Sequence, residues 1–588
     1  MPDENQSEKV ENLLNLSLSA TEAELEKSPI LRDGIIEREA EPIWEVIVKY
    51  HGDISALNSE QIQVEELIAG YGIITLPESF IEPLAAMEEI EFVEKPKSIY
   101  PSDYEGNIAS CITSVTVGAP NLTGRGVLIG VIDSGIDIYN SSFRNADGST
   151  RILYLFDQSL GREFTAEEIN QALSAQTRQE GNEIVPSRDI TGHGTAVASI
   201  AAGKVYSNTA GGTANENDIL LQGAATESQL IIVKLDTKGQ NSFPMTTNLM
   251  RAFHYVVMKA MALKMPIAIN LSFGNTYGSH DGTSLVERFL DNVSEIGRTV
   301  ICVGSGNEGA ASGHVSGRFP GSTENQVIEF SIGEYERSFN LQIWKNYVDD
   351  FSIELTAPSL ESIIINLNET GTQRRRLTET ELLLFIGVPK PYGVNQEIFL
   401  DFLPRDNYIP NGIWKVTFLP RKIVVGEYKL YMPSSTVRGS ATRFLTPSTL
   451  RTLTIPSTAG KIITVGAYDA RYRAYADFSG RGYVEQAAGL IGSTKPDLVA
   501  PGVGILAATP TGTQAVTGTS FATPFVTGAA ALLMEWGLVR GNDPYLYGEK
   551  MKAVLRRGAL PLFENMSYPN ERVGYGALCV ENSLSGSY

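Results

Sequence analysis

The sequence predicts an α/β fold in which helices flank a parallel sheet, with a small α+β domain before it and an all-β domain inserted in it. Three observations lead to this prediction. Short apolar runs alternate with longer amphipathic runs from about residue 111 to 324 and again after 438. Both patterns mix within residues 43–100, and eight short runs replace them between 325 and 437. Alternating strands and helices form right-handed βαβ units, and hence a parallel sheet.

The N-terminal hundred residues form two sections of different composition. Residues 1–42 are predicted to be an acidic, solvated leader with one short helix, because residues 1–41 hold eleven acidic and four basic side chains. Residues 43–100 are predicted to fold as a small α+β domain. Its expected elements are strands at 43–48, 71–76 and 90–94, a connection at 62–68 and a helix at 78–87.

The main domain is predicted in two parts, 101–324 and 438–588. Its first part contains apolar runs of the length of buried strands and amphipathic runs of the length of helices. The expected strands cover 127–132, 230–235, 267–273 and 300–303, and the expected helices cover 246–261 and 284–295. Parallel sheets place their functional groups at the carboxyl ends of strands, so the residues that follow these runs are candidates for chemistry.

Residues 325–437 interrupt the α/β pattern. Most of their short runs alternate apolar and polar residues, with turn residues between the runs, which predicts an inserted all-β jelly-roll domain. The eight expected strands cover 327–332, 339–344, 352–355, 363–367, 382–386, 397–402, 413–418 and 427–431. These runs contain no catalytic motif, so we expect the chemistry in the α/β domain.

Composition argues against several classes of function. A net charge of −21 argues against nucleic acid as a partner, because phosphate binding needs clustered basic residues. Cys111, Cys302 and Cys579 lie far apart without metal-ligand spacing, so we expect reduced thiols and neither metal nor cofactor. The chain begins without a signal-peptide pattern, and no run reaches the roughly 18 apolar residues of a membrane span. We therefore expect no membrane contact and an intracellular location.

Three motifs contain the candidate catalytic residues. In residues 517–524, small residues lead into an Ala-rich run with Pro524 expected in its first turn, which places Ser520 at a helix N-terminus that favours an oxyanion. Asp133 ends the first apolar run of the main domain and is followed by Ser-Gly. His193 lies between two glycines at the start of another Ala-rich stretch, and none of the other four histidines is framed in this way. Each motif alone is also compatible with an ordinary cap or turn.

In the chain order Asp, His, Ser, the motifs together resemble those of the subtilisin-like serine proteases, peptidase family S8. The resemblance implies a subtilisin-like sheet and a serine endopeptidase whose triad is Asp133, His193 and Ser520. Asp137 is the rival for the carboxylate, although it lies outside the Asp-Ser-Gly frame. The other site residues that the resemblance implies are Asn307 for the oxyanion hole, Ser272, Phe273 and Gly274 for pairing with the substrate backbone, and Gly304, Ser305 and Gly306 for the pocket that receives the residue before the scissile bond.

The α+β domain at 43–100 is similar to the intramolecular chaperone prodomain of this family. Such a prodomain packs on the protease and places its C-terminal tail in the active-site cleft as the first substrate. Here the tail would be residues 94–102, and cleavage would fall between Ser98 and Ala109. A docking domain that is never cleaved is the alternative.

A prodomain without a signal peptide, a jelly roll inserted at this place and an intact triad together resemble the Csp germination proteases of clostridial spore-formers. In that group the cleaved prodomain stays bound, and the substrate is the precursor of a spore-cortex hydrolase. The resemblance implies a protein or peptide substrate and a cytoplasmic or spore-associated location. Some members have lost catalytic residues, so the alternative function is that of a prodomain-blocked sensor or scaffold in germination signalling.

Overall fold

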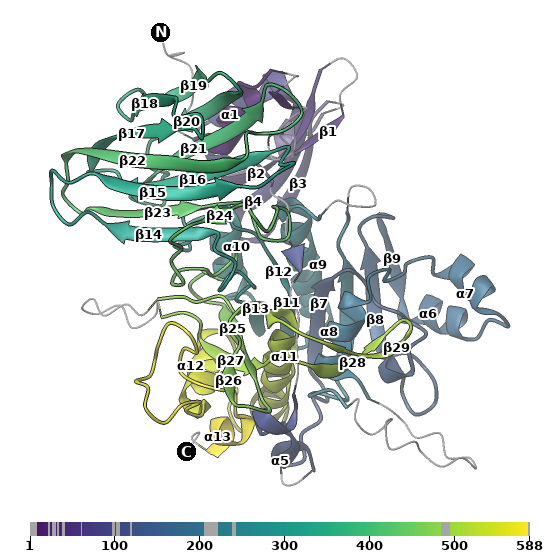
Figure 1. Ribbon diagram of the computed structural model, residues 1–588. Helices are drawn as coiled ribbons and strands as arrows, with labels where there is room; N and C mark the ends of the chain where they lie inside the picture. The colour runs from purple at the N-terminus through teal and green to yellow at the C-terminus, as the bar shows by residue number, and fades with distance from the viewer. Residues whose placement is uncertain are drawn as a thin grey trace.

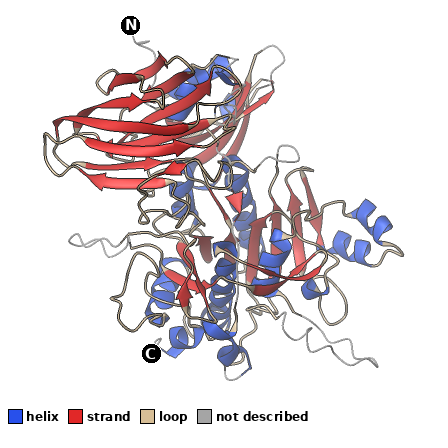
Figure 2. Cartoon of the chain, in the orientation of Figure 1, coloured by secondary structure: helices blue, strands red, loops and turns tan. Residues whose placement is uncertain are grey.

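The chain folds into three parts that contact one another (Figure 1). The α/β domain lies in the lower half of the view, an antiparallel sandwich lies above it, and the N-terminal domain lies beside the sandwich. Figure 2 shows strands dominating the upper half and helices surrounding the lower sheet. The computed structural model describes residues 9–21, 24–25, 31, 34–37, 41–59, 61–96, 100–101, 106–117, 120–204, 222–237, 243–483 and 494–585.

The α/β domain is built on a central sheet whose order is β26-β25-β13-β11-β7-β10-β8-β9, with β27 also paired to β25. Its strands run parallel except for β9 and β26 at the edges, which confirms the expected parallel sheet. The strands are β7 (Leu128–Asp133), β8 (Ile152–Asp157), β9 (Arg162–Thr165), β10 (Gln229–Lys234), β11 (Ile267–Leu271), β13 (Thr299–Gly304), β25 (Ile463–Asp469), β26 (Ala474–Tyr475) and β27 (Leu498–Pro501).

Helices cover both faces of this sheet. The helices are α8 (His193–Ala202) and α11 (Thr519–Met534) on one face, and α9 (Thr246–Leu263) and α10 (Leu285–Val293) on the other. On β7, Ile129 and Val131 face the first pair, whereas Leu128 and Ile132 face the second. Alternate side chains of a strand point to opposite faces, so the continuous apolar run of β7 supplies two cores at once.

Helix α11 lies at the centre of the α/β domain. By length and composition alone, Thr519–Val539 is long and apolar enough to cross a membrane. The expectation that no segment would be apolar enough for a membrane span was therefore wrong. Of the most apolar window of this helix, however, 83% is buried inside the protein. That burial is what a core helix requires, because the helix packs against both α8 and the sheet.

The N-terminal domain has a sheet of order β1-β2-β4-β3, with β5 also paired to β2. One face covers its own helix, and the opposite face, with Ile47, Tyr71 and Phe92, packs on α9 and α10. Residues 63–67 form a strand and not the expected connection. The elements are β1 (Ile35–Glu37), β2 (Ile43–Tyr50), β3 (Gln63–Leu67), β4 (Tyr71–Pro77), α4 (Ile81–Ala86) and β5 (Ile90–Glu94).

The sandwich consists of two antiparallel sheets around one apolar core. One sheet has the order β14-β23-β16-β21-β20-β19, and the other β18-β17-β22-β15-β24. All eight expected strands are present, and β14, β19 and β24 are additional. The strands are β14 (His314–Arg318), β15 (Gln326–Ile332), β16 (Phe339–Asn346), β17 (Asp350–Thr356), β18 (Ser362–Asn366), β19 (Gly371–Arg376), β20 (Thr380–Ile386), β21 (Asn395–Pro404), β22 (Gly412–Lys422), β23 (Glu427–Tyr431) and β24 (Arg443–Phe444).

Most of the expected leader that the structure describes is buried or half-buried, and residues 10–17 are buried throughout. Helix α1 (Asn12–Leu18) packs Leu13 and Leu16 on Leu383 and Phe399 of the sandwich, whereas Leu14 joins the core of the N-terminal domain. The prediction of a solvated leader was wrong because it gave more weight to the acidic composition than to three closely spaced leucines. Burial of each leucine stabilises the fold by about 1.5–3 kcal/mol. Residues before β2 therefore attach the N-terminal domain to the sandwich.

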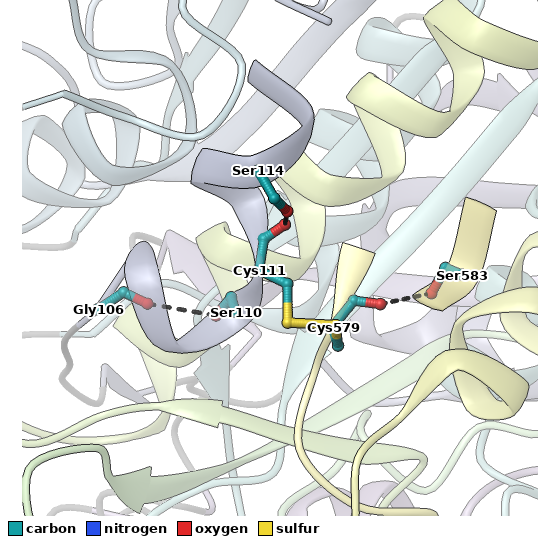
Figure 3. The surroundings of a disulfide bond; sticks show 6 residues. All are labelled: Gly106, Ser110, Cys111, Ser114, Cys579 and Ser583. Carbon is teal, nitrogen blue, oxygen red and sulfur yellow. Dashed lines mark hydrogen bonds between the residues drawn. A yellow bond between two sulfur atoms is a disulfide. The ribbon is translucent and has the colours of Figure 1, made fainter. Parts of the chain in front are cut away.

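Cys111 and Cys579 form a disulfide, which corrects the expectation of reduced thiols (Figure 3). Cys111 lies just before α5 (Ile112–Val117), and Cys579 lies just before α13 (Val580–Ser585). They are 468 residues apart in sequence, so spacing gave no indication of the pairing. Cys302 remains a free thiol on β13, where burial raises its pKa to about 12.

Candidate active site

Asp133 and His193 are in direct contact. Asp133 is the last residue of β7, at the carboxyl end of the sheet, and His193 is the first residue of α8. His193 Nδ1 lies 2.6 Å from Asp133 Oδ1, and the Asp133 side chain is completely buried. A buried carboxylate at Nδ1 fixes the tautomer whose Nε2 can accept a proton. The pair has the geometry of a general base and the carboxylate that orients it.

Ser520 lies in the first turn of α11, as the sequence predicted. The ring of His193 lies 4.8 Å, centroid to centroid, from the ring of the next residue, Phe521. The ends of β7, α8 and α11 therefore lie close together, and His193 is in ring contact with the neighbour of Ser520. That Ser520 completes a triad with Asp133 and His193 stays a prediction. The N-terminal amides and the dipole of α11 favour negative charge next to Ser520.

Ser272 and Ser520 are joined by two reciprocal hydrogen bonds. Ser520 Oγ donates to the Ser272 carbonyl, and Ser272 Oγ donates to the Ser520 carbonyl, each at 2.9 Å. Pro524 makes the second bond available, since it lies four residues later and lacks the N–H that would bond the Ser520 carbonyl. The sequence analysis expected Pro524 in the first turn of the helix. That expectation was wrong, because α11 begins at Thr519 and Pro524 lies beyond its first turn.

Asn307 follows β13 and is oriented by Thr519. Its Oδ1 accepts hydrogen bonds from Thr519 N (3.2 Å) and Thr519 Oγ1 (3.3 Å). Thr519 Oγ1 in turn accepts from Gly306 N (3.1 Å). Because Oδ1 is occupied in this way, the amide group that Asn307 can offer to a developing oxyanion is its NH₂, which is the group that this role needs.

The predicted substrate-binding strand is already paired. β12 (Phe273–Gly274) forms an antiparallel pair with β6 (Tyr100–Pro101), with Phe273 opposite Pro101 and Gly274 opposite Tyr100. The two residues of β6 belong to the tail that was predicted to occupy the cleft. The last predicted tail residue, Ser102, lies outside the described residues.

Gly304, Ser305 and Gly306 are buried beside the same strand. Ser305 N donates to the Val465 carbonyl (2.8 Å), and Ser305 Oγ lies 3.4 Å from Ser479 Oγ, so this side chain points away from β12. Gly306 has a φ of +85°, a conformation that favours glycine. The segment lies between β12 and the nucleophile helix, and its role in binding substrate stays a prediction.

Asp137, the rival carboxylate, is used elsewhere. Its Oδ1 pairs with Arg178 at 2.9 Å and accepts from Tyr139 N. Besides the predicted Asp133, a second carboxylate supports His193, namely Asp189, which is 5% exposed and which sequence reasoning missed. Asp189 accepts from Gly192 N (2.9 Å) and from Thr195 N (2.8 Å), and so caps the turn that begins with His193. The sequence signal that could have indicated this role is an Asp a few residues before the Gly-His pair at which the helix begins.

Glu308 is a second residue that sequence reasoning missed. It follows Asn307 and accepts hydrogen bonds from Ser434 Oγ (2.7 Å) and Ser435 Oγ (2.9 Å). Ser434 and Ser435 lie just after β23, in the linker between β23 and β24 of the sandwich. The loop that carries Asn307 is therefore fastened to a linker of the sandwich, an arrangement that no local sequence pattern indicates.

The N-terminal domain docks on α9 and α10 through polar contacts around an apolar centre. Tyr71 packs edge to face on Phe289, with ring centroids 5.2 Å apart. Glu94 accepts a hydrogen bond from Leu285 N (3.0 Å) at the start of α10. On α9, Arg251 forms ion pairs with Glu45 and Glu65. These contacts hold the domain from which β6 extends into the site.

His254 contributes a titratable contact to the same interface. Its Nδ1 accepts a hydrogen bond from the backbone N–H of Ile68 (3.3 Å). Burial lowers the pKa of His254, and the nearby Glu65 carboxylate opposes this shift. The docked state therefore favours the neutral imidazole.

Within the described residues, no group of three or more His, Cys, Asp or Glu side chains could hold a metal ion. The site chemistry described above uses a hydroxyl, an imidazole, a carboxylate and amides. That the chain needs neither metal nor cofactor stays a prediction.

Two known families match this chain. The Csp protease B prodomain matches residues 8–97, and the Subtilase family matches residues 124–380 and 439–576. The prodomain match covers the described part of the expected leader as well as the domain after it. The N-terminal domain, with the residues before it that match, is called the prodomain below.

A solved structure gives a strong match over most of the chain. The Clostridium perfringens CspB protease is 34% identical, with a TM-score of 0.75, over 82% of this chain and 97% of that one. Subtilisin-like protease SBT3.7 of Arabidopsis thaliana is 24% identical over 70% of this chain, and serine protease AprX of Bacillus subtilis is 31% identical over 23%.

The chain spans 56% of the plant protein and 32% of the Bacillus protein. The Subtilase family match covers both parts of the α/β domain, including the residues that form the Asp133–His193 contact and the start of α11. The chain belongs to the subtilase family of serine proteases, and it resembles the Csp proteases.

Proposed function

We propose that this chain is a serine endopeptidase that first cleaves its own prodomain from the α/β domain and then cleaves a protein substrate. The observation that carries the proposal is the pairing of β6 with β12. The end of the prodomain lies as an antiparallel strand along the segment that holds Ser520 through Ser272, which is how an extended peptide substrate binds an exposed strand.

The proposed mechanism is acyl transfer. Ser520 Oγ attacks the carbonyl carbon of the scissile bond while His193 Nε2 accepts its proton. His193 then gives the proton to the leaving amine as the C–N bond breaks, and water releases the acyl group by the reverse steps. Asp133 holds the imidazole and stabilises the imidazolium, and the Asn307 NH₂ and the Ser520 N–H stabilise the oxyanion.

The geometry narrows the expected cleavage interval. β6 ends at Pro101 on one side of the site. On the other side, a Cβ added to Gly106 would lie 2.9 Å from Pro501 Cβ, so the backbone at 106 is packed against β27. We therefore expect the cut between Pro101 and Gly106, within the earlier interval of Ser98 to Ala109.

Intact mass under denaturing, reducing conditions tests the proposal. Wild-type protein should give two fragments that add up to the full chain plus one water, and Ser520→Ala should stay whole. If both proteins stay whole, self-cleavage does not occur. If both are cut, Ser520 is not the nucleophile.

The resemblance to the Csp proteases supports a finer proposal for the substrate. It is the precursor of a spore-cortex hydrolase, and the protease acts in the cytoplasm or at the spore, with the sandwich corresponding to the jelly roll of that group. Incubation of the precursor with wild-type or Ser520→Ala protein tests this proposal, since only the wild type should produce the shortened hydrolase.

A second candidate function is that of a sensor or scaffold whose prodomain permanently blocks the cleft. The burial of α1 between the prodomain and the sandwich favours it, because this contact would persist after cleavage. The germination rate of spores that carry Ser520→Ala distinguishes the two functions. A protease loses its effect on germination, whereas a scaffold keeps it.

A further inference from the structure

A cavity of about 750 Å³ lies where the prodomain docks on the α/β domain. Glu45 of β2 and Glu65 of β3 line it from the prodomain, and its other walls come from α9, from β8 and from residues just after β8 and β10. Small-molecule sites typically enclose about 300–1,000 Å³ and often lie between domains. The cavity therefore has the size and position of a ligand site, and the described residues that line it include none of the predicted catalytic residues.

Aromatic and apolar side chains form part of the wall. The rings of Phe156 on β8 and Tyr255 on α9 stack with their centroids 4.8 Å apart. Met258, one turn after Tyr255, also lines the cavity and is 43% exposed. The apolar part of a ligand would cover these side chains, and a cation near the rings would gain from their π faces.

Two prodomain carboxylates share one arginine at this cavity. Glu45 and Glu65 both form ion pairs with Arg251 of α9. His254 adds no positive charge, because its Nδ1 accepts the Ile68 N–H and the imidazole is then neutral. At the prodomain side of the cavity, the carboxylates therefore outnumber the cations.

The remaining charged residues of the cavity add to the negative charge. Lys259 is neutralised by Glu163, whose carboxylate lies 2.7 Å from the lysine Nζ. Asp236, just after β10, is half-buried, and its backbone N–H donates to Gln158 Oε1 (3.3 Å). Within the described part of the chain, the Asp236 carboxylate itself forms no ion pair. A carboxylate without a cation in a low-dielectric cleft attracts a positively charged ligand.

We propose that the cavity binds a small organic cation, an amine with an apolar body, and that this ligand holds the prodomain on the α/β domain. The ammonium group would lie between Asp236 and the prodomain carboxylates, and the apolar body would lie against Tyr255 and Met258. The complete site exists only when the prodomain is docked, and a ligand that binds one state alone stabilises that state. The site goes beyond the proposed function and needs no self-cleavage.

Calorimetric titration of the full chain carrying Ser520→Ala tests the binding, because this chain is expected to stay whole. The probe is phenethylammonium, and its matched analogues are phenethyl alcohol, which is neutral, and hydrocinnamate, which is anionic. We expect the ammonium probe to bind with a Kd of about 1 mM or lower, as is ordinary for a ligand of this size. Both analogues should bind at least about tenfold more weakly, since they lack the charge that the carboxylates select.

Two variants locate the site. Asp236→Asn should weaken phenethylammonium binding at least about tenfold, because a hydrogen bond to a charged group is lost. Ala262→Trp should abolish binding by bulk alone, since Ala262 is an exposed residue of α9 that lines the cavity. Asp406→Asn, which changes an exposed carboxylate of the sandwich, is the control and should bind like the unmodified chain. No binding of the probe, equal affinity for all three compounds, or unchanged affinity in either folded cavity variant would overturn the site.

Hydrogen exchange at Ile68 tests the effect on docking. Its N–H donates to His254 on α9, so it exchanges when the prodomain moves away from that helix. At about ten times the Kd of phenethylammonium, exchange in peptides that contain Ile68 should slow by about tenfold, and Asp236→Asn should lose this effect. Unchanged exchange at that concentration would overturn the coupling to docking. A wild-type chain that fails to cleave itself would overturn the proposed function and leave this site standing.

Discussion

His193 is supported by two carboxylates that act on different parts of the residue. Asp133 contacts the imidazole itself at 2.6 Å, whereas Asp189 binds the backbone amides of the turn that begins at His193. The first contact sets the tautomer and charge of the ring, and the second sets the position of its backbone. Loss of the first should therefore change catalysis without changing the fold.

We expect Asp133→Asn to slow self-cleavage by about 10⁴-fold, because an amide at this position favours the wrong imidazole tautomer. The rate is measured from the fraction of intact chain over time, and circular dichroism checks the fold. Asp137→Asn is the matched control, since Asp137 pairs with Arg178 and not with His193. A variant at Asp133 that cleaves as fast as the wild type would contradict the assigned role.

Sequence predicted those site residues that lie within long motifs, and it missed those that act from a distance in the chain. Asp133, His193 and Ser520 stand at element ends with recognisable flanks. Asp133 contacts His193, whose ring contacts Phe521, the residue after Ser520. Glu308 acts through partners more than 100 residues away, so its role depends on the tertiary fold alone. No local pattern encodes such contacts.

At the scale of elements, the sandwich is joined to the Asn307 loop by the linker between β23 and β24. Glu308 binds Ser434 and Ser435 at the end of β23, and it is the neighbour of Asn307. A hydrogen bond to a charged group typically contributes about 1.5–3 kcal/mol. The linker therefore contributes to the position of the Asn307 amide.

We expect Glu308→Ala to slow self-cleavage by about tenfold, because the Asn307 loop loses its attachment. In an Asn307→Ala background, which itself should cost about 10²–10³-fold, Glu308→Ala should add little, because the two changes act on one interaction. Glu336→Ala is the control, as Glu336 fastens Gly439, farther along the same linker. Additive effects of the two changes would show that Glu308 does not act through Asn307.

Strands with several apolar residues were predictable, whereas edge strands rich in charged or polar residues were not. The eight expected strands of the sandwich each bury an apolar face in one core. β19 has the sequence Gly-Thr-Gln-Arg-Arg-Arg and β3 contains two adjacent glutamates, and both lie at sheet edges. Charged residues are common on edge strands because they discourage pairing with other chains. The composition of such a strand therefore resembles that of a loop, and the sequence does not indicate a strand.

At the scale of the whole molecule, prodomain docking should depend on pH through His254. Burial lowers its pKa in the docked state below the ordinary value of about 6.5. The docking free energy from this residue is complete above that pH and is lost as the pH falls toward the docked pKa, since the free form then binds the proton more readily. Acid should therefore weaken docking.

Dissociation of the cleaved prodomain from immobilised protease at about pH 7.5 and about pH 5.5 measures this effect. Faster release is expected at the lower pH, and His254→Gln should reduce the difference. His51→Gln is the control, because the His51 side chain is 60% exposed and pairs with Glu91 of its own domain. An unchanged pH dependence in His254→Gln would assign the effect to other groups.

The disulfide between Cys111 and Cys579 has a mechanical consequence for the cleaved enzyme. Cleavage before Gly106 makes residues near 106 the new beginning of the long fragment, while Cys579 lies close to its other end. A force that pulls on both ends of that fragment would pass directly from Cys111 to Cys579 through the sulfur bridge. The sheet, the sandwich and the catalytic residues all lie within the closed loop, so such a pull would leave them unstretched.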